Sequence, residues 1–225
     1  MGCLLFGAPA SAQGPTPAPR PADRVGTTSV EMWAGFGARS SHWGFLGDAA
    51  NRSFAIVAAR VTHRIHNWST VGLDYTVDAI PYARLTPAPA LRALVNPPVP
   101  PCEGPPGTMC TYTVSSNFYA SGSATARGVN PVGLELVFHP DQPWQFRMGA
   151  SGGALWFDRA VPVIYATRFN FTGMIEAGAQ YLTRQGRGVT VMYRLHHLSN
   201  AGIGTLNPGV ASHILSLGVR WRLSP

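Results

Sequence analysis

Two side chains that could act together as a nucleophile and a base lie near the C-terminal end of the sequence. His197 and Ser199 are separated by one residue, within the run RLHHLSNAG at positions 194–202. A histidine that accepts the proton of a serine hydroxyl forms the minimal pair for acyl transfer. The run therefore indicates ester chemistry, provided that both side chains point the same way.

The alternation of residues 188–199 predicts that they do. Apolar residues occupy every second position of this segment: Val189, Val191, Tyr193 and Leu195 alternate with Thr190, Met192, Arg194 and His196. Side chains alternate between the two faces of a strand, so His197 and Ser199 belong to the apolar face. A nucleophile and base placed there would face outward, into whatever covers that face.

Strand-like alternation recurs along the chain. We expect eight strands, at roughly 27–39, 53–64, 68–79, 125–138, 144–157, 167–182, 188–199 and 211–223. The alternation is clearest in the last strand, and the parity of residues 53–64 is ambiguous. Strands of ten or more residues with this pattern are typical of outer-membrane barrels, whereas soluble sandwiches use shorter strands. The sequence predicts an all-β fold, an eight-stranded antiparallel outer-membrane β-barrel over residues 27–225.

The polar face of the predicted strands carries charges of both signs. Because an eight-stranded lumen is filled by side chains and unpaired buried charge is costly, we expect these charges to form ion pairs. The acids are Glu31, Asp74, Glu135 and Glu176, and the bases are Arg147, Arg194, Arg220 and Arg222. Ion pairs of this kind stabilise the barrel and are not catalytic. A lumen this narrow leaves no wide channel, so a transport pore is disfavoured.

Composition and charge narrow the classes of molecule that this chain could bind. Charged residues are only 12% of the chain, about half the usual share, and no stretch approaches the ~20 apolar residues of a membrane helix. The formal net charge of +7 suggests an anionic partner. The arginines are scattered rather than clustered in a run, which favours lipid phosphates over nucleic acid.

The ends and connections suggest export and an orientation. Residues 1–12 resemble a truncated signal peptide that ends in Ala-Ser-Ala, and residues 13–26 a Pro-rich periplasmic tether. Short links after every second strand indicate periplasmic turns and termini. The end of strand 188–199 then lies at the outer rim, in the leaflet that holds lipopolysaccharide. Cys102 and Cys110 fall in the long extracellular loop, where a disulfide is favoured over a zinc site.

Several stretches resemble the lipid A 3-O-deacylase family of outer-membrane barrels, also known as acyloxyacyl hydrolases. The resemblance covers roughly residues 27–223 and is carried by HLSNAG at 197–202, NPG at 207–209, RFNF at 168–171 and GVNPVG at 128–133. It implies that Ser199 is the nucleophile and His197 its general base, with Asn200 and Gly202 holding the oxyanion. The implied substrate is lipid A of lipopolysaccharide among the outer-membrane lipids.

One departure concerns the acid that orients the histidine in that family. It stands on the final strand twelve residues after the serine, a position that is Ala211 here, and neither Ser212 nor His213 is a carboxylate. A Ser–His pair oriented by a backbone carbonyl or a water is one alternative. The other is a catalytically inactive structural or adhesive barrel of the same fold.

No cofactor is expected. The histidines show no metal-ligand spacing, and no Gly-rich phosphate loop follows a strand and opens a helix. The sequence does not decide the oligomeric state, and a homodimer is one of the alternatives.

Overall fold

The computed structural model describes residues 24–41, 49–87 and 120–223. The predicted signal peptide, most of the predicted tether, and both Cys102 and Cys110 lie outside these ranges. Within them the chain forms only strands, and no helix there is long and apolar enough to span a membrane.

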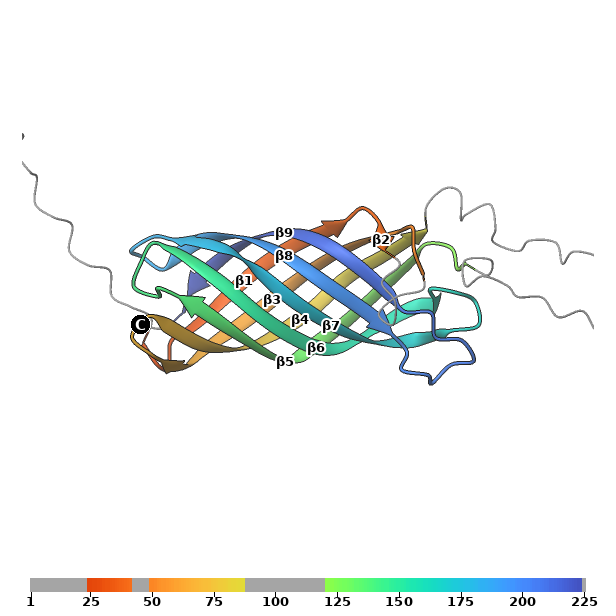
Figure 1. The fold of residues 1–225 in the computed structure, drawn as a ribbon, viewed down its shortest axis with the longest axis horizontal. Coiled ribbons are helices and arrows are strands. Elements are labelled where there is room, and N and C mark those ends of the chain that lie inside the picture. The colour runs from red at the N-terminus through yellow and green to blue at the C-terminus, as the bar shows by residue number, and fades with distance from the viewer. Residues whose placement is uncertain (1–23, 42–48, 88–119, 224–225) are drawn as a thin grey trace, which may run out of the picture.

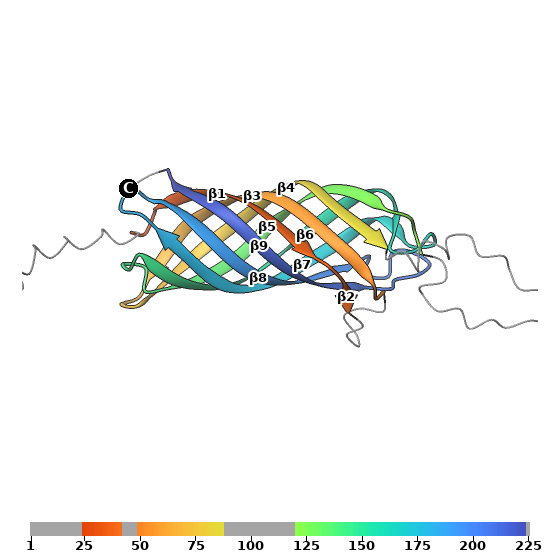
Figure 2. The same ribbon diagram turned by 90° about the horizontal axis from the view of Figure 1, so that it is seen from above.

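The strands form one antiparallel sheet that closes on itself (Figures 1 and 2). The long strands are β1 (Thr28–Gly37), β3 (Arg52–Asn67), β4 (Val71–Pro87), β5 (Ala124–Phe138), β6 (Trp144–Val161), β7 (Thr167–Leu182), β8 (Arg187–Ser199) and β9 (Val210–Arg222). Each pairs with the next in sequence, and β1 pairs with β9 to complete the ring of eight. The two-residue β2 (Ser40–Ser41) adds to β9 beyond the end of β1. The predicted all-β antiparallel barrel is confirmed.

Some strands extend further than the sequence suggests, because prolines interrupt the pattern without ending the pairing. β4 continues past Pro81 to Pro87, and the pairing register with β5 shifts between Ile80 and Ala83. Pro131 in β5 lies at a similar shift, between Val129 and Val132. Proline lacks the N–H that a sheet ladder needs, so it is accommodated at such bulges.

The connections separate into two ends of the barrel. Short turns follow β3, β5 and β7 at the end that also carries the start of β1 and the end of β9 (Figure 1). β1, β4, β6 and β8 finish at the opposite end, which we call the long-loop end because more residues separate most of these strands from the next long strand in the sequence. β8 runs toward it, so His197 and Ser199 lie there.

A buried charge network occupies the half of the lumen nearer the short turns. Arg147 donates to both oxygens of Glu135, at 2.8 and 2.7 Å, and to Glu31 at 2.9 Å. Arg194 bonds to Glu176, and Arg220 lies 3.7 Å from Asp74. These contacts agree with the predicted ion pairing, while Arg222 lies half-exposed at the barrel end.

Three further charges join the network. Arg60 binds Asp78 at 2.7 Å and also contacts Glu176 and Glu135, and Arg64 pairs with Asp74. The sequence did not indicate Arg60 and Arg64, because the parity of β3 was ambiguous.

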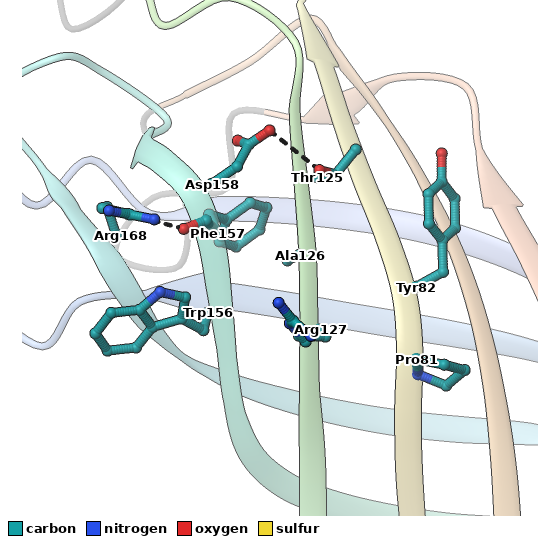
Figure 3. A pocket seen from close by; sticks show the side chains of 9 residues that line it. All are labelled: Pro81, Tyr82, Thr125, Ala126, Arg127, Trp156, Phe157, Asp158 and Arg168. Carbon is teal, nitrogen blue, oxygen red and sulfur yellow. Dashed lines mark hydrogen bonds between the residues drawn. The ribbon is translucent and has the colours of Figure 1, made fainter.

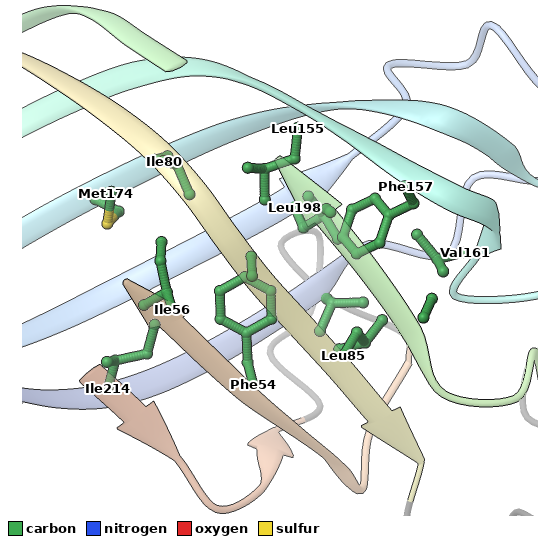
Figure 4. Packing of buried hydrophobic residues seen from close by; sticks show 14 of the residues in the cluster. Phe54, Ile56, Ile80, Leu85, Leu155, Phe157, Val161, Met174, Leu198 and Ile214 are labelled. Atoms are coloured by element: carbon green, nitrogen blue, oxygen red, sulfur yellow. The ribbon is translucent and has the colours of Figure 1, made fainter. Parts of the chain in front are cut away.

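Apolar side chains fill the lumen toward the long-loop end (Figure 4). They include Phe54, Ile56, Ile80, Leu155, Phe157, Leu198 and Ile214, all at most 1% exposed. After Arg52, the inward residues of β3 are apolar from Phe54 to Ala58 and polar or charged from Arg60 to Arg64, which explains the ambiguity. Because side chains occupy both halves of the lumen, a ligand would have to be bound elsewhere.

Candidate active site on the outer wall

His197 and Ser199 both point outward from β8 near the long-loop end. The side chains of His197 and Ser199 are half-buried. Leu198, which lies between them, and His196, which precedes them, are buried in the lumen. The strand alternation therefore positions the two predicted reactive groups on the same outer face. His196 faces the interior, where its ring stacks on Phe54 at 4.5 Å and its Nε2 lies 2.6 Å from the Thr172 hydroxyl.

The turn after β8 holds the serine hydroxyl. Ser199 Oγ donates to Asn207 Oδ1 at 3.0 Å and accepts from the Ala201 N–H at 3.1 Å. Asn207 Oδ1 also accepts from the backbone N–H of Asn200, at 2.9 Å. Transfer of the serine proton to His197 thus requires that the Ser199 hydroxyl first give up its hydrogen bond to Asn207.

The two predicted oxyanion donors are engaged within the same turn. The Asn200 side chain, 1% exposed, donates from Nδ2 to the Leu206 carbonyl at 2.8 Å. Its Oδ1 accepts from the Gly202 N–H at 3.0 Å. Gly202 has a φ of +79°, a conformation suited to glycine. These groups shape the turn in this structure, and their role toward an oxyanion stays a prediction.

A shallow apolar groove of about 300 Å³ lies beside His197 on the outer wall. Small residues flank the histidine on both neighbouring strands: Gly173 on β7 and Ala211 on β9 are its register partners. A Cβ added to Gly173 would meet no atom within 4 Å. Packing therefore does not demand glycine there, and the missing side chain leaves space next to the histidine.

Ala211 stands where a carboxylate could have faced His197. The strand carboxylates that the structure describes lie in the lumen, except that of Asp158 at the outer end of β6. The alanine itself lines the groove and is 1% exposed. Neither register partner of the histidine, Gly173 or Ala211, is therefore an acid.

The profile of the family described as lipid A 3-O-deacylase (PagL) matches residues 105–220. The chain belongs to the lipid A 3-O-deacylase family. The match spans β5 to most of β9 and so includes His197, Ser199 and the turn between β8 and β9. No protein among the curated ones matches the sequence.

Two solved structures of outer-membrane proteins are similar to this chain. The outer membrane enzyme PagL shares 18% identity, with 84% of this chain and 97% of that chain covered and a TM-score of 0.48. Neisserial surface protein A shares 14% identity, with 87% and 97% covered and a TM-score of 0.51. At these identities the likeness concerns the fold alone.

A second serine–histidine contact lies on the same wall of this family member. The Ser41 hydroxyl is 3.0 Å from His213 Nε2, and the Tyr193 hydroxyl bonds to Nδ1 of the same ring. Tyr193 and His213 lie within the matched region, and Ser41 on β2 lies outside it. This contact could not be predicted from the sequence, because a two-residue strand has no periodicity to detect.

Proposed function

We propose that this protein is an outer-membrane esterase that removes an ester-linked acyl chain from lipid A of lipopolysaccharide. Membership of the lipid A 3-O-deacylase family, with His197 and Ser199 facing outward together inside the matched region, carries the proposal. The apolar groove beside His197 adds support, since an acyl chain approaching from the membrane needs such a surface.

The proposed reaction proceeds through an acyl-enzyme. Ser199 Oγ attacks the ester carbonyl while His197 takes its proton, and Asn200 and Gly202 are the proposed donors to the oxyanion. Collapse of the tetrahedral intermediate breaks the bond to the sugar oxygen, which leaves with the proton from His197. A water, deprotonated by His197, then releases the fatty acid and restores the serine.

The proposed orientation places the short turns in the periplasm and the long-loop end outside. Large apolar side chains cover the outer wall on each of the eight long strands, among them Met32, Val61, Tyr75, Leu134, Phe146, Ile175, Val191 and Leu217. A wall of this kind suits contact with lipid. His197 and Ser199, near the long-loop end, would meet lipid headgroups and ester bonds in the outer leaflet.

Ala211 favours a second candidate, a structural or adhesive barrel that has lost the chemistry. In a triad enzyme the replacement of the acid by its amide lowers the rate by about 10⁴, because the histidine is then held in the wrong tautomer. The hydrogen bond from Ser199 to Asn207 fits this candidate equally well.

Mass spectrometry of lipid A separates the two candidates. Cells expressing the wild-type protein should release one acyl chain from lipid A, and cells expressing Ser199→Ala should not. Ser41→Ala serves as the matched control, because Ser41 is the other serine in contact with a histidine on this wall. Unchanged lipid A in all three strains, with folded barrels present, would favour the inactive barrel.

A fluorophosphonate probe identifies the reactive serine directly. We expect the labelled peptide to contain Ser199 and the label to persist in Ser41→Ala. Labelling at Ser41 instead would move the chemistry to the contact with His213.

A further inference from the structure

The lumen does not account for the positive charge of this chain. Five buried acids face five buried arginines in the network, namely Glu31, Asp74, Asp78, Glu135 and Glu176 against Arg60, Arg64, Arg147, Arg194 and Arg220. Their charges balance, so the formal net charge of +7 is carried by residues outside this network. Of the described arginines outside the network, Arg52 is buried against backbone carbonyls, and the others lie exposed or half-exposed at the surface.

Two such arginines line a hollow in the outer wall at the long-loop end (Figure 3). The hollow has a volume of about 380 Å³ and is formed by β4, β5, β6 and the start of β7. Arg127 and Arg168 contribute the positive charge, and Tyr82 and Trp156 the aromatic surface. It differs from the groove beside His197, whose lining is almost wholly apolar.

The one acid in this hollow is already engaged. Asp158 accepts a hydrogen bond from Thr125 at 3.1 Å and lies 3.4 Å from Arg159. Arg168 donates to the Phe157 carbonyl at 3.1 Å, and its guanidinium lies 5.9 Å from the centre of the Trp156 ring. Neither contact neutralises its charge.

The guanidinium group of Arg127 makes fewer contacts than that of Arg168. The Arg127 guanidinium has neither an ion pair nor a hydrogen bond within the part of the chain that the structure describes, in contrast to the lumenal arginines. An exposed arginine on a lipid-facing wall is favourable only where its charge meets water or an anionic headgroup.

A continuous row of aromatic rings joins the hollow to the candidate active site. Trp156 contacts Phe169 at 6.1 Å, Phe169 contacts Phe171 at 5.2 Å, and Phe171 is the register partner of Ser199. Arg127 pairs with Trp156 across β5 and β6. Arg127 and Ser199 are therefore separated by three strand spacings and by two residues along the strand, roughly 16 Å in all, a span that one large glycolipid headgroup can cover.

We propose that Arg127 and Arg168 bind a phosphate of the lipid A headgroup and so position the ester at Ser199. This proposal deepens the proposed function and rests on it. Guanidinium groups recognise phosphate through paired, charge-assisted hydrogen bonds. The hollow thus selects a phosphorylated glycolipid, while the groove beside His197 receives an acyl chain.

Binding to the Ser199→Ala protein tests the site without any hydrolysis. Native mass spectrometry of the folded barrel in micelles would compare lipid A that carries its phosphates with chemically dephosphorylated lipid A. We expect at least about tenfold tighter binding of the phosphorylated form. Equal affinity for the two forms overturns the proposal, as does equally effective competition by phosphatidylglycerol, which would indicate generic attraction of anionic lipids.

Arg127→Gln is the decisive variant, because its guanidinium has no partner in the described structure whose loss would disturb the fold. It should lose about tenfold in affinity for phosphorylated lipid A and nothing for the dephosphorylated form. Arg184→Gln, an exposed arginine in the turn between β7 and β8 at the opposite end, is the matched control. An equal loss in both variants contradicts a specific site.

The outcomes also separate this proposal from the proposed function. Phosphate-dependent binding without any deacylation by the wild-type protein would retain the headgroup site and reject the esterase. Deacylation combined with phosphate-independent binding would retain the esterase and reject the headgroup site.

Discussion

Replacement of Ala211 by glutamate should raise deacylase activity. Ala211 is the register partner of His197 across β8 and β9, and both side chains face the groove. Directly opposed residues in an antiparallel pair have Cβ atoms about 4.5–5.5 Å apart, a gap that a glutamate side chain spans. The groove, of about 300 Å³, has room for the added atoms.

The size of the gain follows from what an orienting acid contributes. In a triad enzyme the loss of that acid's charge lowers the rate by about 10⁴, equivalent to ~5.5 kcal/mol of activation free energy. A carboxylate introduced without supporting contacts recovers part of this, so we expect a rise of about 10²–10³ in Ala211→Glu.

The assay is fatty-acid release from purified lipid A by the refolded barrels, with the folded fraction checked by the heat-dependent shift in gel migration. Ala211→Gln, which has the same size and no charge, should stay near the wild-type rate. The double variant Ala211→Glu, Ser199→Ala should be inactive. A folded Ala211→Glu barrel whose rate equals that of the wild type would refute the idea that a missing acid limits this site.

Two further substitutions test the groove and the lumen. Gly173→Leu fills the space beside His197, so it should lower deacylation at least about tenfold and leave the unfolding midpoint unchanged. Ala179→Leu is the control, because Ala179 also faces outward on β7 but is exposed and distant from His197, and this variant should change neither the deacylation rate nor the midpoint. Equal losses in both would argue against an acyl-chain groove. Arg147→Met leaves Glu31 and Glu135 without their shared partner and should cost about 3–5 kcal/mol in urea unfolding from lipid vesicles. Adding Glu135→Gln should recover part of that loss, and an unchanged stability in the single variant would show that the network contributes little.

The fold could be predicted from the sequence because the outer wall imposes a strict period of two. That period appears at positions 189–193 of β8 and 215–221 of β9, where every second residue is apolar and exposed. It fails in β3, because the lumen is apolar at one end and charged at the other. Arg60 belongs to the charged part, so its central place in the network emerged only from the structure.

The candidate site was predictable in part, for a related reason. Parity alone places His197 and Ser199 outward, since both lie within a regular strand. The hydrogen bonds that hold Ser199 depend on the turn at 200–209, where Asn207 reaches back across eight positions to the serine. Hydrogen bonds between a strand residue and a turn residue produce no periodic pattern in the sequence. The contact between Ser41 and His213 was missed for the same reason.

The charge balance of the lumen also limits where an orienting group for His197 could come from. Each strand acid on the inner face already bonds to an arginine, and Glu135 accepts from both Arg147 and Arg60. Turning one of these acids outward would leave a buried arginine unpaired, at a cost of several kcal/mol. Among the strand acids that the structure describes, a carboxylate for His197 could therefore come only from the outer wall, where position 211 is one of its two register partners. The acids of the lumen therefore cannot replace the carboxylate that position 211 lacks.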